Sequence, residues 1–587
     1  MIPVLTYINN RLTALLKKAA SSRASGDGVL TREDFKYLAV LMFAFTALVF
    51  FRLGNFHAPE SYYKTDTVNR DIVLDFGEYT DIGSFSVFLG NLNTRHFSLS
   101  AFNEVTGAWE VINGQASAES VFAWNKIDIN YRLRYLGIVA TDDQCVLNEL
   151  VACRPDGSPI LPVNAEDYPA LFDEQDTFPA VKTYMAGTMF DEVYHGRTAY
   201  EFLHGLTTYE TTHPHLGKIL ISLGILLFGM APFGWRFMPA VFGILLIPLI
   251  YLFAKRLFRD SFTAGVTTAL LTFDCMHYNL SRIATIDIFA AFFIVLMYYY
   301  MYQYFVKDNA YRSSPDALTD RFPPKEVYTP LALSGISMAF GIATKWTGVY
   351  AGAGLCILFF WYTITHFPRK QALRLFGFCC LFFVAVPLLV YVLCFIPVVG
   401  YAPYKNLLDK VVQGTVYMFD YHSNLVAEHY YSSPFYEWPI IWMPLLDAND
   451  GVGGEKVSAI SCMGNPAIWW PGIFCTLYVF FLWIIKKDKK AGFLCIAYLA
   501  QYVPWMSISR ITFIYHYFPA ILFVILMMGY TVLQIKEHFP WGKKAAAVYL
   551  LVAVIVFLVF FPVVSGLPVS KEYGMHLRWL KDWILVL

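Results

Sequence analysis

The sequence predicts a polytopic α-helical membrane protein that carries an inserted extracytoplasmic β-sandwich domain. Of its 587 residues, 57% are hydrophobic and only 15% are charged, whereas soluble domains carry roughly 25% charged residues. Apolar stretches recur from Phe35 to the C-terminus, and many approach the roughly 20 residues that a helix needs to cross a bilayer. Residues 62–165 lack such stretches and show short alternating runs instead. The composition excludes a soluble enzyme.

Positive charges set the expected orientation of the spans. Lys plus Arg and Asp plus Glu number 44 each, so no net basic field gathers nucleic acid and no nucleic-acid partner is expected. The positive-inside rule places basic loops, together with the N-terminal segment 1–35, in the cytoplasm. The basic clusters are Lys255/Arg256/Arg259, Lys307/Arg312, Arg369/Lys370/Arg374, Lys486/Lys487/Lys489/Lys490 and Lys536/Lys543/Lys544.

About eleven transmembrane helices fit this charge pattern. No small-residue cleavage site follows the first apolar run, which we therefore expect to remain as a span. The run from Lys218 to Met230 is too short to span and would invert every later loop, so it is predicted to be a juxtamembrane helix on the outer face. Residues 55–235, the loop 397–466 and the tail 566–587 then lie outside. The predicted spans are 36–54, 236–256, 261–278, 286–306, 329–344, 348–366, 375–396, 467–485, 491–508, 512–533 and 545–563.

The segment 62–165 is predicted to be a β-sandwich. Runs such as Asp71-Ile-Val-Leu-Asp-Phe, Phe85-Ser-Val-Phe-Leu and Tyr135-Leu-Gly-Ile-Val alternate in hydropathy and are separated by turn residues. Their order resembles that of the galactose-binding-like (discoidin) sandwich. Eight of the ten cysteines lie in or near apolar spans and are expected to be buried hydrophobes. Cys145 and Cys153 lie in the insert and are disulfide candidates in an oxidising compartment.

Two adjacent carboxylates, Asp191 and Glu192, mark residues 185–235 as the candidate catalytic outer loop with its juxtamembrane helices. Adjacent acids at a helix start point in different directions, so one can act as a general base while the protein holds the other. The alternative is that both only complement the helix dipole. Two further motifs follow in the same region, Thr212-His-Pro-His-Leu-Gly-Lys and Gly234-Trp-Arg-Phe. Their presence close to the two acids favours the catalytic interpretation.

These motifs resemble the first outer loop of the protein O-mannosyltransferases, polytopic enzymes of the lipid-phosphate-dependent GT-C class. That loop carries an Asp-Glu pair, a His-Pro-Pro-Leu-Gly-Lys motif and an arginine entering the second span; the second proline is His215 here. The resemblance covers residues 36–54 and 185–565 and implies a GT-C fold, with a transmembrane core over 236–565. The loop 397–466 is too short for the β-trefoil MIR module of the eukaryotic enzymes, so the chain looks like the bacterial branch. Later motifs that agree in order are Ser281-Arg-Ile-Ala-Thr-Ile-Asp287, Thr344-Lys-Trp-Thr-Gly348, Ser433-Pro-Phe-Tyr-Glu-Trp-Pro439, Gly464-Asn-Pro-Ala-Ile-Trp-Trp470 and Arg510-Ile-Thr-Phe-Ile-Tyr-His-Tyr-Phe-Pro519.

The resemblance and the topology predict a binding site for a lipid-linked sugar phosphate at the outer ends of the spans. Arg236, Lys345 and Arg510 are expected to bind the donor phosphate; snorkelling to lipid headgroups is the alternative for each. The other predicted donor contacts are His213, His516 and Asp287, the last orienting an arginine such as Arg282. Candidate acceptor or sugar contacts, with the interfacial aromatic belt as the alternative, are Trp346, Trp438, Trp469 and Tyr515.

The expected reaction is inverting transfer of mannose from polyprenyl-phosphate-mannose to a Ser or Thr hydroxyl of a secreted or membrane protein. Asp191 is the expected base, and Glu192 is expected to orient the acceptor or Asp191. The sequence has no glycine-rich phosphate loop, no Asp-x-Asp motif in its outer loops and no zinc-ligand spacing, so no cofactor or metal is implied. The plasma membrane is the expected location, with the site outside the cytoplasm.

Two alternatives stay open at this point. One is a GT-C transferase that uses another lipid-linked sugar, or a lipid or cell-wall glycan as acceptor. The other is a membrane-anchored glycan-binding receptor or transporter, which predicts internal repeats and charges within the spans. The charges of this sequence gather at span ends, which favours the transferase.

Overall fold

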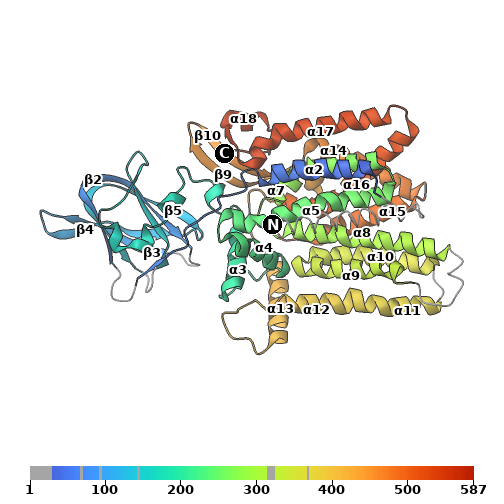
Figure 1. Cartoon of the computed structure of the whole chain (residues 1–587), viewed down its shortest axis with the longest axis horizontal. Coiled ribbons are helices and arrows are strands. Elements are labelled where there is room, and N and C mark those ends of the chain that lie inside the picture. Colours follow the sequence, from blue (N-terminus) through green and yellow to red (C-terminus); the bar gives the residue numbers. More distant parts are fainter. Residues whose placement is uncertain (1–29, 66–70, 91–94, 142–145, 314–323, 367–368) are drawn as a thin grey trace, which may run out of the picture.

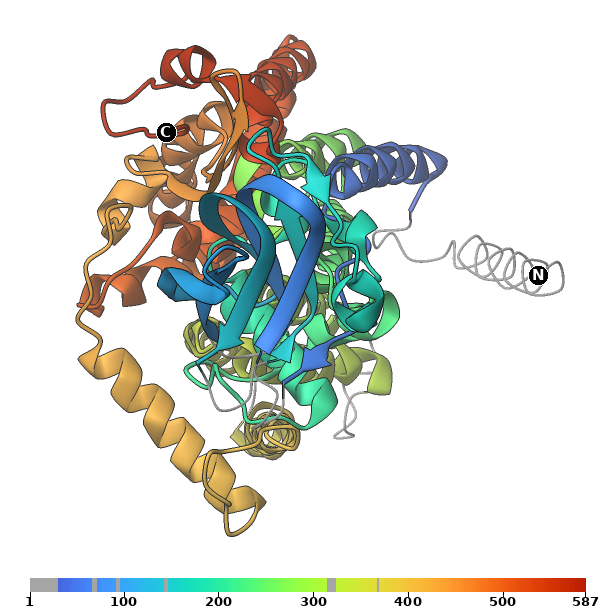
Figure 2. The same cartoon turned by 90° about the vertical axis from the view of Figure 1, so that its left-hand side faces the viewer.

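A bundle of long apolar helices makes up most of the molecule, and a β-sheet domain extends from one end of it (Figure 1). The structure, a computed structural model, describes residues 30–65, 71–90, 95–141, 146–313, 324–366 and 369–587. Seen from its free end, the sheet domain lies in front of the ends of the helices (Figure 2). Most of the predicted N-terminal segment 1–35 lies outside the described residues.

Eight helices in the described part of the chain are long and apolar enough to cross a membrane. Each corresponds to one of the eleven predicted spans. They are α5 (Pro232–Phe258), α8 (Asp287–Arg312), α9 (Lys325–Thr344), α10 (Thr347–His366), α11 with α12 (Arg369–Cys380 and Val386–Leu393), α14 (Pro466–Ile484), α16 (Phe518–His538) and α17 (Gly542–Ser565).

The other three predicted spans are helices that are shorter or carry more charge. They are α2 (Arg32–Phe50), α6 (Ser261–Thr272) with α7 (Cys275–Leu280), and α15 (Lys489–Tyr502). Asp274 separates α6 from α7 because its carboxylate caps the second helix at the amide of His277. α2 packs on α5 and α6, and α15 packs on α10, α14 and α16, so these helices belong to the same bundle.

Capping groups and small residues explain why the helices begin and pack where they do. Thr31 and Asp34 form a capping box at the start of α2, in which the Thr31 amide donates to Asp34 Oδ2 at 2.6 Å. α5, α14 and α16 each begin with a proline in the first two positions, where its missing N–H costs nothing. A Cβ on Gly243 of α5 would lie 2.1 Å from Oγ of Ser281, the residue that follows α7. Only glycine therefore lets α5 approach the end of α7 this closely.

The inserted domain is built on one six-stranded antiparallel sheet with the order β4-β3-β5-β2-β7-β8. A separate two-stranded ladder pairs β1 (Tyr63–Lys64) with β6 (Val146–Leu147). The predicted sheet domain is therefore present, but the described strands form one large sheet and not two facing ones. The strands of the large sheet are β2 (Asp71–Leu89), β3 (Arg95–Asn103), β4 (Ala108–Ala118), β5 (Ala123–Ala140), β7 (Glu149–Cys153) and β8 (Pro159–Ile160).

Bulges explain how a single sheet can enclose a core. The pairing of β2 with β5 shifts register between Asp75 and Thr80 and again between Ile82 and Ser84, and a bulge bends and twists the strand that carries it. This core is separate from that of the helices. Among its fully buried members are Phe85, Phe97, Leu136 and Leu150.

The disulfide candidates are placed only in part. Cys153, at the end of β7, is buried beside Phe88, Trp124 and Val151. Cys145 lies outside the described residues. The pairing of the two cysteines therefore stays a prediction.

The outer loop 397–466 and the tail 566–587 fold together. The loop contains α13 (Leu407–Asn424) and a hairpin of β9 (Leu445–Gly453) and β10 (Lys456–Cys462). β11 (Pro568–Ser570) of the tail pairs with β10. α18 (Lys571–His576) follows, and the buried Trp583 indole donates to the carbonyl of Ile441 at 2.6 Å. The sequence did not predict this hairpin, because β9 is rich in Asp, Asn and Gly, residues that are depleted in strands.

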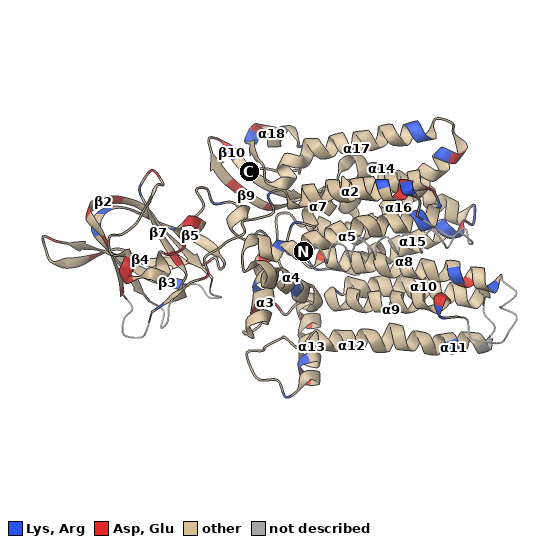
Figure 3. Cartoon of the chain, viewed as in Figure 1, with Lys and Arg blue, Asp and Glu red and all other residues tan. Residues whose placement is uncertain are grey.

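The distribution of charge separates the two ends of the bundle. Lys and Arg gather at the helix ends that lie away from the sheet domain (Figure 3), in agreement with the predicted cytoplasmic side. α3 (Glu192–His204) and α4 (Leu216–Phe228) lie at the other end, next to the sheet domain (Figure 1). α4 has 13 residues, too few to cross the bilayer, as predicted for a juxtamembrane helix.

Candidate active site

A tight turn presents the two predicted carboxylates at the start of α3. Phe190 has φ = 44°, a left-handed conformation that costs free energy in a bulky residue and is typical of functional turns. Glu192 closes the turn, since its carboxylate accepts a hydrogen bond from the Met189 amide at 3.0 Å and its own amide donates to the Met189 carbonyl. Asp191 is left at the N-cap position.

Glu192 and Arg236 form a fully buried ion pair. Arg236 Nε and Nη2 donate to the two carboxylate oxygens of Glu192 at 2.7 and 2.6 Å. The remaining three N–H groups donate to the backbone carbonyls of Leu53, Tyr184 and Gly187. Because all five guanidinium donors are used, the prediction that Arg236 binds the donor phosphate is wrong. The pair ties α3 to α5, and Glu192 is a structural partner rather than an acceptor contact.

Asp191 has a different environment from its neighbour. Its side chain makes no capping hydrogen bond and is partly exposed. Burial, reinforced by repulsion from Asp287 and opposed by Lys345, raises the pKa of Asp191 to about 7. A carboxylate with a pKa near neutrality, free of a tight partner, is suited to accept a proton.

Lys345 and Asp287 bring the ends of two spans together. Lys345 follows α9, Asp287 opens α8, and the ammonium lies 2.6 Å from Asp287 Oδ1. The same ammonium lies 5.4 Å above the ring of Tyr515. Asp287 was expected to orient Arg282, which is wrong: Arg282 Nη2 donates to the carbonyls of Phe51 and Arg52. Asp287 instead positions Lys345.

A cavity of about 400 Å³ opens beside this pair. It brings the predicted residues His213, Lys345, Trp346 and Arg510 together, with the histidine His422 of α13 facing them. Lys345 and Arg510 make the cavity a suitable pocket for a phosphate. Its other lining residues are Pro214, Thr347, Tyr350, Phe419, Ser423, Trp505, Ser507, Ile508 and Ser509.

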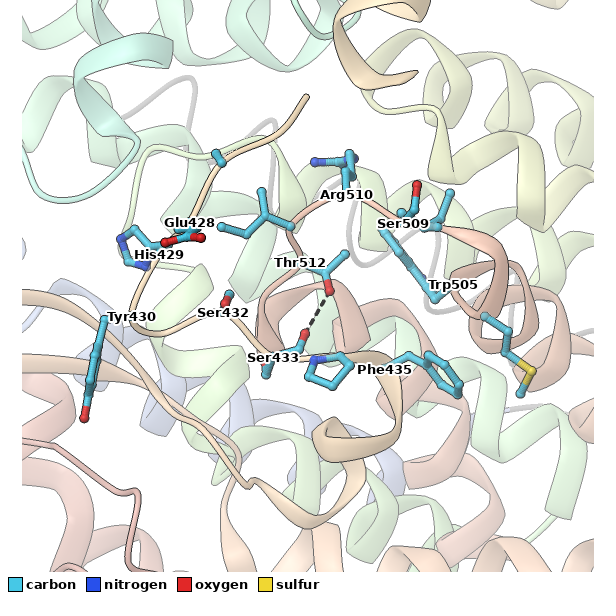
Figure 4. Close-up of a pocket in the computed structure, with 15 residues that line it drawn as sticks. Glu428, His429, Tyr430, Ser432, Ser433, Phe435, Trp505, Ser509, Arg510 and Thr512 are labelled. Atoms are coloured by element: carbon cyan, nitrogen blue, oxygen red, sulfur yellow. Dashed lines mark hydrogen bonds between the residues drawn. The ribbon is translucent and has the colours of Figure 1, made fainter. Parts of the chain in front are cut away.

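Arg510 also borders a second cavity of about 740 Å³. In Figure 4 it lies at the rim with Ser509, its side chain directed away from the hydrogen bond by which Thr512 Oγ1 donates to the Ser433 carbonyl at 2.8 Å. Glu428 and His429 line the opposite part of this cavity (Figure 4). Arg510 thus lines both the cavity that contains Lys345 and the larger, more open cavity. The larger cavity has room for part of an acceptor chain.

The motif that begins at Thr212 builds a buried network around Glu210. Its carboxylate accepts hydrogen bonds from the Thr212 amide at 2.8 Å, from His213 and from the fully buried ammonium of Lys218. Although burial opposes it, the charge of Lys218, with His213, holds the pKa of Glu210 well below its usual range. Burial lowers the pKa of His213, so a neutral imidazole faces the cavity. His215 is buried between Phe202 and Phe395 and only packs.

Three other predicted contacts do not reach the cavity. The buried indoles of Trp438 and Trp469 donate to the Ser433 carbonyl and to Asp274. His516 is buried against Trp505 and Trp438, and its Nδ1 lies 3.0 Å from the Phe513 carbonyl. The predictions that these side chains bind sugar or donor are therefore wrong. Tyr515 fits better, since its ring lies under Lys345 and beside Phe190.

Sequence reasoning missed two residues of this region. His422 lines the cavity, donates through Nε2 to the Thr212 carbonyl at 2.8 Å, and has a buried Nδ1 without a partner among the described residues. Burial, with repulsion from His213 and Arg510, lowers its pKa to about 4. Asp447 of β9 is buried and accepts from Asn279 at 2.9 Å; burial, with repulsion from Asp191, raises its pKa to about 8. Neither residue stands in a recognisable motif.

Comparison with known proteins decides the family. Residues 229–399 match the family described as "Dolichyl-phosphate-mannose-protein mannosyltransferase", and residues 407–583 match the "C-terminal four TMM region of protein-O-mannosyltransferase". The two matches together cover more than half of the chain. The chain belongs to the protein O-mannosyltransferase family.

Relatives of this O-mannosyltransferase are bacterial as well as fungal. The polyprenol-phosphate-mannose–protein mannosyltransferase of Mycolicibacterium smegmatis is 26% identical over 457 residues, 68% of this chain and 88% of that protein. That of Mycobacterium tuberculosis is 25% identical over 473 residues, 68% and 87%. The solved Saccharomyces cerevisiae Pmt1-Pmt2 complex bound to the sugar donor has a TM-score of 0.57 at 15% identity, covering 68% of this chain and 89% of that one. The likeness confirms the predicted GT-C fold.

The family match also shows which parts of this O-mannosyltransferase lie inside the matched segments and which lie outside them. Lys345 and Arg510 lie within the matched segments, and the carboxylate pair lies before them. The whole sheet domain lies outside both segments. The chain is therefore a multi-pass membrane mannosyltransferase with a sheet domain outside the matched segments.

Proposed function

We propose that the chain transfers mannose from polyprenyl-phosphate-mannose to Ser or Thr hydroxyls of exported proteins. The observation that carries this proposal is the cavity in which Lys345 and Arg510 meet, with the ionisable carboxylate of Asp191 coupled to Lys345. A phosphate needs the two cations, and an attacking hydroxyl needs the base. The names of the bacterial relatives support the donor and the acceptor class.

The proposed reaction is a single displacement. The acceptor oxygen attacks the anomeric C1 of mannose as the bond between C1 and the phosphate oxygen breaks, and polyprenyl phosphate leaves with the bonding electrons. Asp191 takes the proton of the hydroxyl. Because the hydroxyl attacks from the face opposite the leaving phosphate, the configuration at C1 inverts.

Lys345 and Arg510 stabilise the leaving phosphate in this proposal. The ammonium of Lys345 is held in place by Asp287 and by the ring of Tyr515, so it requires little reorganisation when charge develops. Arg510 offers a planar fork suited to phosphate oxygens. The neutral imidazoles of His213 and His422 line the same cavity and provide hydrogen-bonding groups without adding charge. No step of this scheme calls for a cofactor.

The reaction is proposed to take place on the outer face of the plasma membrane. The cavity lies on the side of α3 and α4, opposite the basic helix ends (Figure 3), and the positive-inside rule assigns those basic ends to the cytoplasm. Exported acceptor proteins would therefore reach the site as they leave the membrane on its outer face.

A donor assay tests the proposal. The purified chain in nanodiscs is given polyprenyl-phosphate-mannose or polyprenyl-phosphate-glucose with a Ser/Thr-rich peptide, and products are read by mass spectrometry. We expect a mass gain of one hexose with the mannose donor alone. Arg510→Ala should weaken donor binding and transfer together, since it removes a phosphate contact from ground and transition states alike. Transfer from the glucose donor at an equal rate would reject the proposed sugar specificity.

A further inference from the structure

Three carboxylates meet where the chain enters and leaves the sheet domain. Glu149 begins β7, and Asp173 and Glu174 belong to the segment that leads back to the membrane. One oxygen from each lies within 4.8 Å of the others. Ser61, on the entering segment, donates through Oγ to Asp173 Oδ1 at 2.7 Å and to Glu174 Oε2 at 3.0 Å.

Glu149 is the unusual member of this group. It is fully buried, and its Oε1 accepts hydrogen bonds from Gln175 and from the Glu174 amide. Its Oε2 is buried without a hydrogen-bond partner in the described part of the chain. Leaving a buried carboxylate oxygen unpaired is costly, so this oxygen indicates a ligand.

The charge of the group points to the kind of ligand. No salt bridge joins Glu149, Asp173 or Glu174 to a lysine or arginine among the residues that the structure describes. Three acidic groups thus share a small volume without a cation from the chain. Oxygen donors alone select hard cations such as Ca²⁺ over Zn²⁺ and copper, which prefer nitrogen and sulfur.

We propose that Glu149, Asp173 and Glu174 bind one Ca²⁺ ion that fastens the sheet domain to the membrane domain. Glu149 would contribute its unpaired Oε2. Asp173 is exposed, which leaves room for the waters that complete the flexible coordination shell of Ca²⁺. The ion would hold the entering and leaving segments together, and the transfer reaction proposed above does not pass through it.

A proton on Glu149 is the competing explanation. Burial, with repulsion from Asp173 and Glu174, raises the pKa of Glu149 to about 7. A protonated carboxyl would also relieve the repulsion within the group. The two explanations differ because a proton makes the junction sensitive to pH alone, whereas an ion makes it sensitive to Ca²⁺ at constant pH.

Calcium titration of the full-length chain tests the proposal. The protein in detergent is stripped with EDTA and titrated with CaCl₂ by calorimetry at constant pH, and the junction is probed by limited proteolysis. We expect one ion per chain with a Kd of about 10⁻⁴–10⁻³ M, typical of extracellular sites, and slower cleavage when Ca²⁺ is bound. Glu149→Gln and the exposed Asp173→Asn should each weaken binding at least about tenfold. The matched control Asp176→Asn, a neighbouring exposed acid outside the group, should bind as wild type.

Three results would overturn the proposal. One is the absence of Ca²⁺ binding up to about 5 mM, beyond the range of extracellular sites. The second is binding that neither Glu149→Gln nor Asp173→Asn weakens. The third is a cleavage rate that changes with pH between 6 and about 8, around the ordinary upper range of a raised carboxyl pKa, but not with Ca²⁺. Asp173→Asn keeps the test valid if Glu149→Gln fails to fold.

Discussion

At the scale of single residues, two neighbouring carboxylates have opposite environments. Glu192 is fully buried and paired with Arg236, whereas Asp191 is partly exposed and has a pKa near 7. The strained turn at Phe190 separates their directions. The sequence predicted that the protein would hold one of the two acids, but Arg236, 44 residues further along, could not be recognised as the partner because pairing over that distance depends on the packing of α3 against α5.

Asp191→Asn should separate chemistry from binding. The amide keeps the size of the carboxylate but cannot accept the proton, so we expect the transfer rate to fall by about 10²–10⁴-fold, about 3–5 kcal/mol of barrier. Donor binding should persist because Lys345 and Arg510 remain. Transfer to a Ser/Thr peptide and donor binding are measured on one preparation, with the partly exposed Asp409→Asn of α13 as control. A near wild-type rate would mean that Asp191 is not the base, and Asp287 would be tested next, since Glu192 is engaged.

The pH profile should report the same carboxylate. Folding raises the pKa of Asp191 to about 7, and only the ionised form accepts a proton. The single-turnover rate should therefore rise about tenfold per pH unit below pH 7 and level off above it. Rates are measured between pH 5 and about 9, spanning that pKa on both sides. A profile that is flat through this range would contradict the assignment, as would an identical profile for the residual activity of Asp191→Asn.

Breaking the buried ion pair of Glu192 and Arg236 should lower the stability of the fold rather than change the specificity of the transfer reaction. Glu192→Gln leaves the Arg236 charge buried and unpaired, which typically costs about 3–5 kcal/mol. The double variant Glu192→Gln, Arg236→Met should recover part of the loss, because both charges are then absent. Thermal unfolding in detergent measures the effect. Lys126→Met, which breaks the exposed pair with Asp128, is the control and should change little. Equal melting temperatures for Glu192→Gln and wild type would refute the structural role.

At the scale of elements, the sheet domain is an addition to the catalytic part. Its core is separate from that of the helices, and it meets α3 through the contact of Phe122 with Tyr200, whose rings lie 5.1 Å apart. The proposed base lies beyond the domain in the sequence and at the start of α3 in the structure. Its strands were predicted, but one bent sheet and two packed sheets give the same alternation of hydropathy, so the number of layers could not be predicted.

Deletion of residues 62–165 tests the role of this domain. The deletion leaves Ser61 and Glu166 as chain ends, and Ser61 Oγ lies 2.7 Å from Asp173 Oδ1, so a short linker together with residues 166–172 should bridge the gap. We expect a membrane-inserted protein that binds donor and glycosylates short peptides but acts poorly on folded acceptors. Donor binding and transfer to a peptide and to a protein acceptor are compared with the full-length chain. Loss of donor binding would show that the domain is part of the catalytic site.

At the scale of the whole molecule, the expected orientation depends on where the basic residues lie. The spans could be predicted because length and hydropathy are local properties of the sequence, and all eight long apolar helices agree with predicted spans. Lys345 and Arg510 could be placed near each other from the family motifs. The burial of Trp438, Trp469 and His516 could not, because an aromatic residue at an interface has the same local sequence whether it faces a cavity or the core.

Cysteine labelling tests the orientation. In a background without native cysteines, Asp156→Cys in the sheet domain should react with a membrane-impermeant reagent added outside intact cells. Lys487→Cys, in the basic loop between α14 and α15, should react only after the cells are opened, because positive loops stay in the cytoplasm. The cysteine-free parent gives the background. Labelling of Lys487→Cys in intact cells would invert the arrangement and move the proposed site to the cytoplasm.

The closeness of Ser61 to Asp173 has a practical consequence for engineering. A compact module whose two ends are held a few ångströms apart can be exchanged without stretching the backbone that carries it. Another globular protein with adjacent termini, such as a fluorescent reporter, could be grafted at the same place while the helices keep their arrangement. Residues 62–172 of this transferase can in that sense be replaced as one unit, and their replacement offers a way to redirect the enzyme toward chosen acceptors.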